Sequence, residues 1–203
     1  MAPDETKNVY RLYDKIADWF DETRTRQLIE KQYLEFFGRY LKSGAPVLDL
    51  GCGTGEPILR FLAEQKFEVT GVDASDGMLA IAKERFPETR FINCDMRALE
   101  LDERFDGIVA WHSFFHLAFD DQRKMFEIFA RHMNSGGILI FTSGPKHGEA
   151  WGENNGEMLY HASLDADEYR ALLKAHHFDV LQHVVEDAEC GGATVWVARY
   201  IPT

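Results

Sequence analysis

The chain has 203 residues, a length typical of one compact domain with a small appendage. Its 34 Asp and Glu residues outnumber the 22 Lys and Arg residues, and the formal net charge of −12 would repel the phosphate backbone of a nucleic acid. With 45% hydrophobic residues, the composition excludes a disordered chain and predicts a globular protein with a sizeable core. We therefore expect no nucleic-acid partner.

The sequence carries no signal for export, membrane insertion or disulfide formation. The first residues form neither a basic nor an apolar run, and nowhere do about 18 consecutive apolar residues occur. The three cysteines, Cys52, Cys94 and Cys190, are widely spaced and never arranged as CxxC, so neither a disulfide framework nor a structural zinc site is predicted. We expect a cytoplasmic protein with no membrane partner and no bound metal.

Residues 1–45 are predicted to form an N-terminal helical cap. Between residues 4 and 43, apolar and aromatic side chains recur at spacings that suit two amphipathic helices, separated by a charged break at residues 21–25. The stretch Ser43-Gly44-Ala45-Pro46 ends the second helix.

Residues 46–142 have the alternating pattern of an α/β core. Strands are predicted at residues 47–50, 67–72, 90–94, 105–111 and 137–142, and helices at 57–65, 76–86 and 122–132. Such alternation implies parallel strands with right-handed crossovers and helices on both faces of the sheet.

The last quarter of the chain is predicted to differ from this pattern. Residues 143–164, rich in glycine, are expected to form an irregular lid or substrate loop, because long loops in compact domains are usually functional. Residues 165–203 are expected to contain a helix at 165–177 and strands at 180–185 and 194–200. These two strands, joined by the turn Gly191-Gly192, should form an antiparallel pair.

A glycine-rich loop follows the first predicted strand. Gly51, Gly53 and Gly55 stand at alternate positions, which lets the backbone approach a ligand at the carboxyl end of the sheet. The spacing differs from the GxGxxG pattern of dinucleotide-binding loops, and Glu56 places a negative charge where a pyrophosphate would need a helix N-terminus. The loop therefore favours a ligand without phosphate.

Acidic and apolar residues at and after the ends of the second and third strands suit the ribose and the base of a nucleoside. Asp73 ends the second strand, where a carboxylate can accept both hydroxyls of a ribose. Asp95 follows the third strand and could accept from an exocyclic amine, while Met78 and Met96 offer adaptable apolar surface for a base. The pattern predicts an unphosphorylated nucleoside ligand.

The segments VLDLGCGTGEP, VTGVDASDGML, INCDM, FDGIVAW and SGGILIFTS follow one another in the order found in class I S-adenosylmethionine-dependent methyltransferases. The chain resembles that family strongly over residues 46–145. The resemblance implies a Rossmann-like, mostly parallel seven-stranded sheet with an antiparallel C-terminal strand pair. It also implies S-adenosyl-L-methionine as methyl donor and S-adenosyl-L-homocysteine as product. Segments beyond these motifs, such as AWHSFFHL and GGATVWVAR, resemble a bacterial subgroup of small methyltransferases with no assigned substrate. We expect a small-molecule acceptor, because the chain is strongly acidic and no DPPY-type motif of nucleic-acid methyltransferases follows the fourth strand.

The resemblance also implies a cofactor site. Asp49 and the glycine loop would approach the methionine part, Asp95 and Met96 the adenine, and Ala110 and Trp111 the sulfonium. Tyr10, Tyr13 and Trp19 lie where related enzymes place a helix that closes over the cofactor, and the Tyr13 and Trp111 rings could attract the sulfonium cation. The full set expected to bind the cofactor is Tyr13, Asp49, Gly51, Cys52, Gly53, Gly55, Asp73, Ala74, Met78, Asp95, Met96, Ala110 and Trp111.

Two histidines, His112 and His116, follow the fourth predicted strand at the mouth of the expected site. Either could take a proton from a hydroxyl or amine acceptor, and the alternative is that one packs structurally against the neighbouring phenylalanines. Methyl transfer is an in-line displacement, so positioning alone supplies much of the catalysis and a base is not required. A zinc site is not expected, because Ser113 stands where the HExxH pattern has glutamate.

Acceptor contacts are expected from Phe115, Tyr160 and His161. For Tyr160 and His161 the alternative is a hinge that packs the following helix, capped by Ser163 or Asp165. Phe114, Phe115 and Phe119 form either an apolar wall for the acceptor or part of the core.

Two other functions fit the same sequence. One is a protein that binds the nucleoside as a sensor or complex subunit without transferring a methyl group. The other is a transferase of the same fold that moves another group from a related sulfonium nucleoside.

Overall fold

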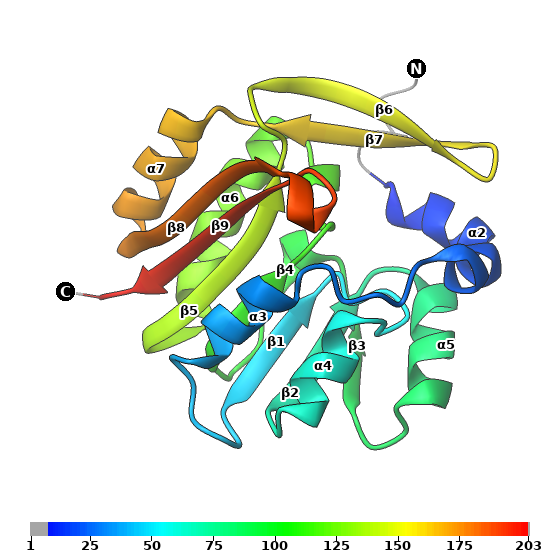
Figure 1. Cartoon of the computed structure of the whole chain (residues 1–203), viewed down its shortest axis with the longest axis horizontal. Coiled ribbons are helices and arrows are strands. Elements are labelled where there is room, and N and C mark those ends of the chain that lie inside the picture. The colour runs from blue at the N-terminus through cyan, green and yellow to red at the C-terminus, as the bar shows by residue number, and fades with distance from the viewer. Residues whose placement is uncertain (1–7, 203) are drawn as a thin grey trace.

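The computed structural model describes residues 8–202, so residues 1–7 of the expected cap and Thr203 lie outside the described residues. The central sheet has seven strands in the order β3-β2-β1-β4-β5-β9-β8 (Figure 1). This confirms the predicted α/β fold, in which strand order reverses between β1 and β4.

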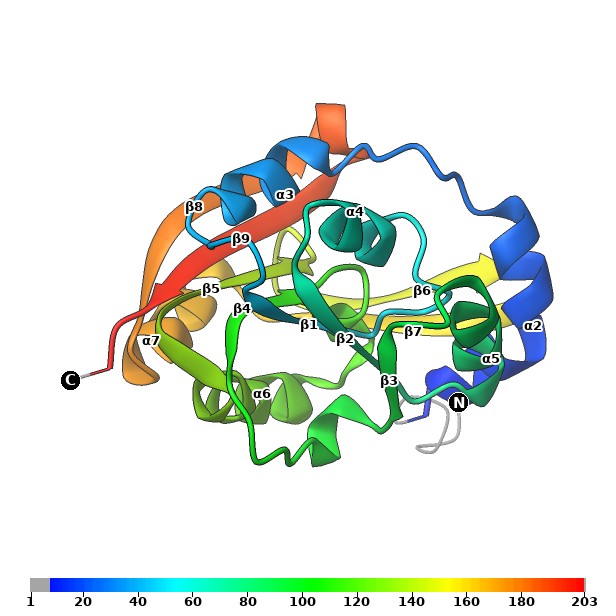
Figure 2. The same cartoon turned by 90° about the horizontal axis from the view of Figure 1, so that it is seen from below.

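The first five strands of this sheet are parallel, as predicted. They are β1 (Pro46–Leu50), β2 (Glu68–Asp73), β3 (Arg90–Asn93), β4 (Phe105–Ala110) and β5 (Met133–Ser143). The crossover helices are α4 (Ile58–Glu64), α5 (Asp76–Arg85) and α6 (Phe119–Arg131). Figure 2 shows α4 and α6 on opposite faces of the sheet.

The C-terminal strands form the predicted antiparallel pair. β8 (Phe178–Asp187) lies at the sheet edge and β9 (Ala193–Tyr200) lies between it and β5, antiparallel to both. Before them, α7 (Ala166–Ala175) begins at Asp165, whose carboxylate accepts from the Glu168 amide at 2.8 Å. The predicted cap at Asp165 is therefore confirmed.

The segment expected to be an irregular loop is a β-hairpin, and that prediction was wrong. β6 (Gly148–Asn154) pairs antiparallel with β7 (Glu157–Ser163) in a separate two-stranded sheet. The connecting residues Asn155 and Gly156 both have positive φ, 49° and 80°. An Asn-Gly pair suits this turn because its two-residue conformation matches the twist of the flanking strands.

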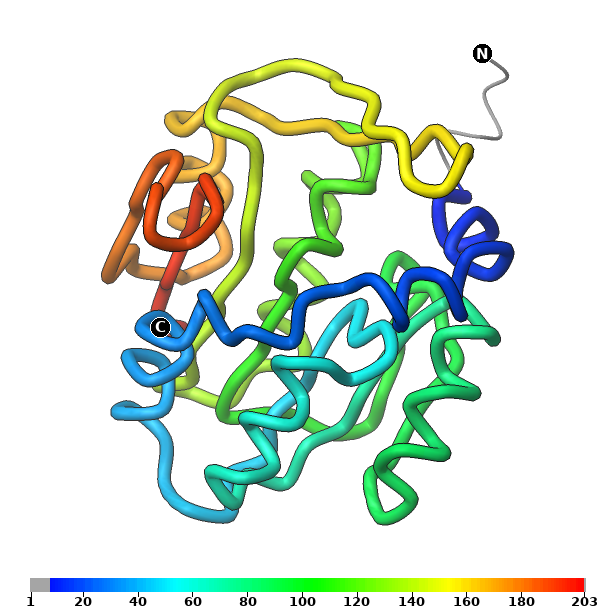
Figure 3. Tube along the Cα trace, turned by 45° about the vertical axis from the view of Figure 1, so that its right-hand side comes forward, coloured from blue at the N-terminus to red at the C-terminus, as the bar shows by residue number. Residues whose placement is uncertain are grey.

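The N-terminal region forms two helices, as predicted: α2 (Tyr10–Thr23) and α3 (Lys31–Gly38). Helix α2 packs on α5, and the turn of the hairpin lies beside it (Figure 3). Lys15 of α2 pairs with Glu157 at 3.1 Å, and Val9 and Leu12 pack with Leu159 of β7. Helix α2 and the hairpin thus pack against each other, and we call this pair of elements the roof.

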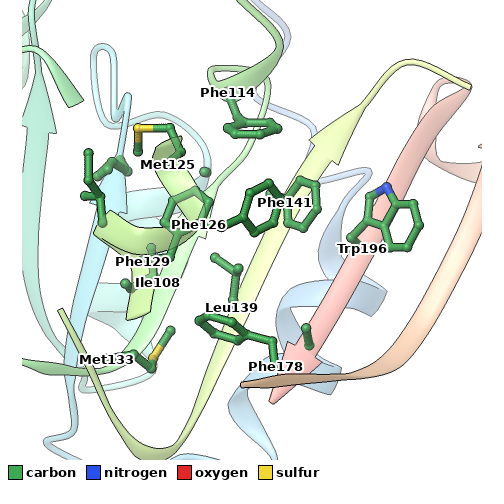
Figure 4. Close-up of a cluster of buried hydrophobic side chains, with 14 of the residues drawn as sticks. Ile108, Phe114, Met125, Phe126, Phe129, Met133, Leu139, Phe141, Phe178 and Trp196 are labelled. Carbon is green, nitrogen blue, oxygen red and sulfur yellow. The ribbon is translucent and has the colours of Figure 1, made fainter. Parts of the chain in front are cut away.

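An aromatic cluster supports the turn that follows β4. Phe114 is fully buried, with its ring 5.2 Å from that of Phe141, which stacks on Trp196 at 5.9 Å (Figure 4). Phe126 and Phe129 complete the cluster. Of the three phenylalanines considered for the acceptor wall, Phe114 therefore belongs to the core.

Replacing Phe114 with alanine should destabilise the protein by about 3–5 kcal/mol, because a fully buried ring would be lost and a cavity left behind. Urea unfolding followed by circular dichroism measures the change. Tyr40→Ala is the matched control, since the ring of Tyr40 is 43% exposed and its loss should cost little. Equal destabilisation by the two variants would contradict the assignment of Phe114 to the core.

Candidate active site

A cavity of about 550 Å³ lies at the carboxyl ends of β1, β2 and β4, where the glycine loop forms one side. Residues of α2 and of the hairpin cover it. A cavity of this volume suits a small-molecule ligand or cofactor.

Most residues predicted for the site line this cavity. They are Tyr13, Asp49, Gly51, Cys52, Gly53, Asp73, Ala74, Met78, Asp95, Met96, Trp111, His112, Phe115, His116 and His161. Tyr10 and Trp19 of the cap also line it, as expected. Gly55, Ala110, Tyr160 and Phe119 are not among the lining residues.

Three of these exceptions have a structural reason. Gly55 has φ of +81°, and a Cβ there would lie 2.5 Å from the ring of Phe86, so this glycine serves packing. Ala110 is fully buried within β4. The ring of Tyr160 packs against Trp151, and its hydroxyl donates to Glu149 at 2.6 Å, so this side chain packs within the hairpin.

The glycine loop is shaped by close approach of the backbone. A Cβ on Gly51, where φ is +79°, would lie 2.2 Å from the Cβ of Ser113. The amides of Gly51 and Cys52 both donate to the Val72 carbonyl, at 2.7 and 3.0 Å. Burial raises the pKa of the Cys52 thiol well above its ordinary value, so Cys52 is a neutral small residue, not a nucleophile.

Asp73 holds the glycine loop while still facing the cavity. One carboxylate oxygen accepts from the Gly53 amide at 2.8 Å, and the other accepts from the Ser75 amide at 2.9 Å. A carboxylate has about four acceptor positions, so each oxygen can accept a further hydrogen bond from a ligand hydroxyl.

Asp49 is a buried carboxylate on the cavity wall, 3% exposed. Within residues 8–202 it accepts no hydrogen bond and forms no ion pair. Burial, with the nearby charge of Asp73, raises its pKa to about 7. A carboxylate in this state favours a cationic ligand, which would offset the cost of its buried charge.

Asp95 is already engaged by an arginine that sequence reasoning did not identify. Its carboxylate accepts from the backbone amide of Arg97 at 2.9 Å and from the Arg97 guanidinium at 2.5 to 3.1 Å. Burial opposes ionisation of Asp95, but the Arg97 hydrogen bonds outweigh it and lower its pKa. Asp95 is therefore ionised, and both Arg97 and a bound base would share its oxygens.

His116 connects the roof to the core. Its Nδ1 lies 2.8 Å from the carbonyl oxygen of Tyr160 and its Nε2 lies 2.9 Å from the hydroxyl of Tyr13. Since a carbonyl only accepts, Nδ1 carries the proton, and Nε2 accepts from Tyr13. Burial lowers the pKa of His116 to about 3, so the ring is neutral and both its nitrogens are occupied.

His112 differs from His116 in having nothing bound to its ring nitrogens within the described chain. Its φ is +49°, an unusual conformation for this residue type, and its amide donates to Thr142 at 2.9 Å. Burial and the charge of Arg24 lower its pKa to about 4. His112 is thus a neutral imidazole beside the cavity, free to bond a ligand, and the packing alternative applies to His116.

Arg24 also lines the cavity, and sequence reasoning missed it. Its guanidinium lies 5.1 Å from the ring centre of Phe20, and no carboxylate of residues 8–202 lies within ion-pair distance of it. No local pattern marks this residue, because its position depends on how α2 docks. That docking uses Asp14, which accepts from Ser75 at 2.6 Å, and Asp21, which pairs with Arg85 at 2.6 Å.

Among the described residues, no three His, Cys, Asp or Glu side chains are grouped so as to hold a metal ion. None of the helices described is both long and apolar enough to cross a membrane.

Comparison with known proteins gives consistent results. A family described as "Methyltransferase domain" matches residues 47–137. The chain is 24% identical over 190 residues to an uncharacterized methyltransferase of Alkaliphilus oremlandii, covering 87% of this chain and 85% of the relative.

Two further relatives have named acceptors. The dTDP-4-amino-2,3,4,6-tetradeoxy-D-glucose N,N-dimethyltransferase of Saccharopolyspora spinosa is 32% identical over 149 residues, covering 67% of this chain and 56% of that relative. The solved 1,6-didemethyltoxoflavin-N1-methyltransferase of Burkholderia thailandensis has a TM-score of 0.77 at 22% identity, covering 100% of this chain and 92% of that structure. Because the glycine loop, the strand order and these matches agree, the chain belongs to the class I S-adenosylmethionine-dependent methyltransferases.

Proposed function

We propose that the protein transfers the methyl group of S-adenosylmethionine to a small-molecule acceptor that lies between His112 and the hairpin. The observation that carries this proposal is one cavity lined by two kinds of group. The carboxylates Asp49 and Asp73 suit a cationic nucleoside, and the imidazole of His112 is unpaired within residues 8–202.

The cofactor would lie along the glycine loop. Asp73 would accept the ribose hydroxyls, because its oxygens have free acceptor positions beside the loop amides. Asp49 would face the positive charge of the methionine part, while Met78 and Met96 would pack on the base. Trp111 and Tyr13 would place ring faces near the sulfonium.

The acceptor end supports transfer to a small molecule. Helix α2 and the hairpin both contribute side chains to the cavity lining, and a volume of about 550 Å³ suits a small molecule. The net charge of −12 also disfavours nucleic acid. The relatives named for an amino-sugar nucleotide and a toxoflavin precursor act on small molecules, which is consistent with the same for this chain.

The chemistry depends on positioning, and His112 adds a proton acceptor. Holding the acceptor atom in line with the methyl carbon and the sulfur supplies much of the rate enhancement. His112, neutral and without a hydrogen-bond partner among residues 8–202, would take the proton that the acceptor atom loses. We place this activity in the cytoplasm, where free thiols such as Cys52, Cys94 and Cys190 persist.

Asp73→Asn should weaken S-adenosylhomocysteine binding by about 10- to 100-fold, because an amide nitrogen cannot accept a hydrogen bond from a ribose hydroxyl. Isothermal titration calorimetry measures the dissociation constant. Asp76→Asn is the control, since this exposed residue begins α5 and does not line the cavity. An unchanged dissociation constant for Asp73→Asn would contradict the proposal that Asp73 binds the ribose.

Affinity for S-adenosylmethionine should fall as pH drops below about 7, the pKa of Asp49 in the unliganded protein. Below this pH Asp49 is protonated and must lose its proton to face the cation, so each pH unit costs up to about tenfold in affinity. Above pH 7 the carboxylate is already charged and the affinity should level off.

Calorimetry between pH 5 and 8 tests this dependence, and Asp49→Asn should bind more weakly with the pH dependence reduced. His112 and His116, with pKa values of about 4 and 3, stay neutral over this range. A wild-type affinity independent of pH would contradict the proposed role of Asp49.

His112→Ala should lower the single-turnover rate of methyl transfer by about 10²- to 10⁴-fold with any acceptor that the wild-type protein methylates, since the proton acceptor is lost. The affinity for S-adenosylhomocysteine should change little. His147→Ala serves as control, because that exposed imidazole stacks on Phe119 outside the cavity. A normal rate in His112→Ala would leave positioning as the whole of the catalysis.

A further inference from the structure

Part of the cavity lining is built of aromatic and imidazole rings. We define the ring wall as Tyr13, His112, Phe115, His116 and His161, all of which line the cavity. Phe115 is central, with its ring 5.5 Å from His112, 4.9 Å from His116 and 5.1 Å from His161. His116 in turn lies 5.4 Å from Tyr13 and 4.7 Å from His161. The ring wall is therefore continuous.

The ring wall carries no charge at neutral pH. Burial lowers the pKa values of its three histidines below their ordinary value and raises the pKa of Tyr13 above its own. No member of the ring wall pairs with a carboxylate in the described part of the chain. The positive charge of the Arg24 guanidinium acts on His112 and helps to lower its pKa.

A positively charged acceptor would be poorly accommodated here. Its ammonium would meet Arg24 and the sulfonium of the cofactor, without a carboxylate on the ring wall to compensate its lost hydration. An uncharged planar ring, in contrast, matches aromatic neighbours in both shape and polarity.

The imidazoles of the ring wall differ in their hydrogen bonds: those of His112 and His161 can bond a ligand, whereas that of His116 is occupied. His116 already uses both of its nitrogens, with Tyr13 and with the Tyr160 carbonyl. His112 uses neither in residues 8–202, and as a neutral imidazole it offers one acceptor and one donor nitrogen. A few polar groups on a mostly apolar wall orient a ligand that carries a matching polar atom, and His112 is the imidazole that follows β4 directly.

We propose that the methyl acceptor is an uncharged planar ring compound with a hydroxyl or ring N–H, which lies against Phe115 and donates its hydrogen bond to His112. This inference rests on the proposed methyl transfer and names the substrate class of the same site. Aliphatic amines, which carry a positive charge at neutral pH, are the class that the ring wall disfavours.

The transfer balances in atoms and charge. The bond from sulfur to the methyl carbon breaks, its electron pair remains on the sulfur, and a bond forms from the methyl carbon to the acceptor oxygen or nitrogen. The acceptor's proton passes to the free ring nitrogen of His112 and then to water. The positive charge lost from the sulfonium is thus carried briefly by the imidazolium.

Three probes of matched size test the proposal on the full chain saturated with S-adenosylhomocysteine. They are 2-naphthol, 2-(aminomethyl)naphthalene, which keeps the rings and adds a positive charge, and decahydro-2-naphthol, which keeps the hydroxyl and loses planarity. Titration followed by saturation-transfer difference NMR gives each dissociation constant. We expect 2-naphthol to bind at least about tenfold more tightly than either of the others.

Variants then locate the probe. His112→Ala and Phe115→Leu should each remove most of the advantage of 2-naphthol, whereas Tyr40→Ala, on an exposed ring outside the cavity, should not change it. Equal or tighter binding of either comparison probe, no binding of 2-naphthol, or no effect of both cavity variants would overturn the proposal.

The same samples also test the proposed function, in a separate measurement. Calorimetry reports S-adenosylhomocysteine binding before any probe is added, and its absence would count against the cofactor and hence the methyl transfer itself. With the cofactor bound, a failed probe series counts against the acceptor class alone.

Discussion

The side chain of His116 is where three separately folded parts of the molecule meet. Its Nδ1–H donates to the Tyr160 carbonyl of the hairpin, its Nε2 accepts from Tyr13 of α2, and the turn that carries it is anchored by Phe114 in the aromatic core. The low pKa of His116 keeps its ring neutral, so Nδ1 donates to the Tyr160 carbonyl while Nε2 accepts from Tyr13. One uncharged ring thus joins α2, the hairpin and the core.

The other constraint is the distribution of charge within the cavity. Burial and the charge of Asp73 raise the cost of ionising Asp49, whereas the ring wall is neutral. A bound sulfonium nucleoside would offset the negative charge of the carboxylates and would bring no charged group of its own into the ring wall. The same arrangement therefore accounts for the proposed cofactor orientation and for the proposed class of acceptor.

The parts predictable from sequence were those specified locally. The glycine loop, Asp73 and the alternating strands are short patterns with a direct backbone meaning, and the structure places them as expected. The hairpin was missed although Asn155-Gly156 marks its turn, because the glycines around it were taken as signs of an irregular loop. His112 and His116 could not be told apart, since the partners of His116 lie 103 and 44 residues away. Arg24 reaches the cavity only through the docking of α2, which no sequence pattern describes.

The position of the hairpin in the chain has a consequence for how such a protein can diversify. The hairpin enters after β5 and contributes Asn154 and His161 to the cavity, while Asp49, the glycine loop and Asp73 come from segments before residue 74. Mutations in β6 and β7 can therefore alter the acceptor end while the residues that face the cofactor stay unchanged. Selection for a new acceptor can begin in this short stretch without rebuilding the methyl-donor site, while His112 and Phe115 lie outside the hairpin.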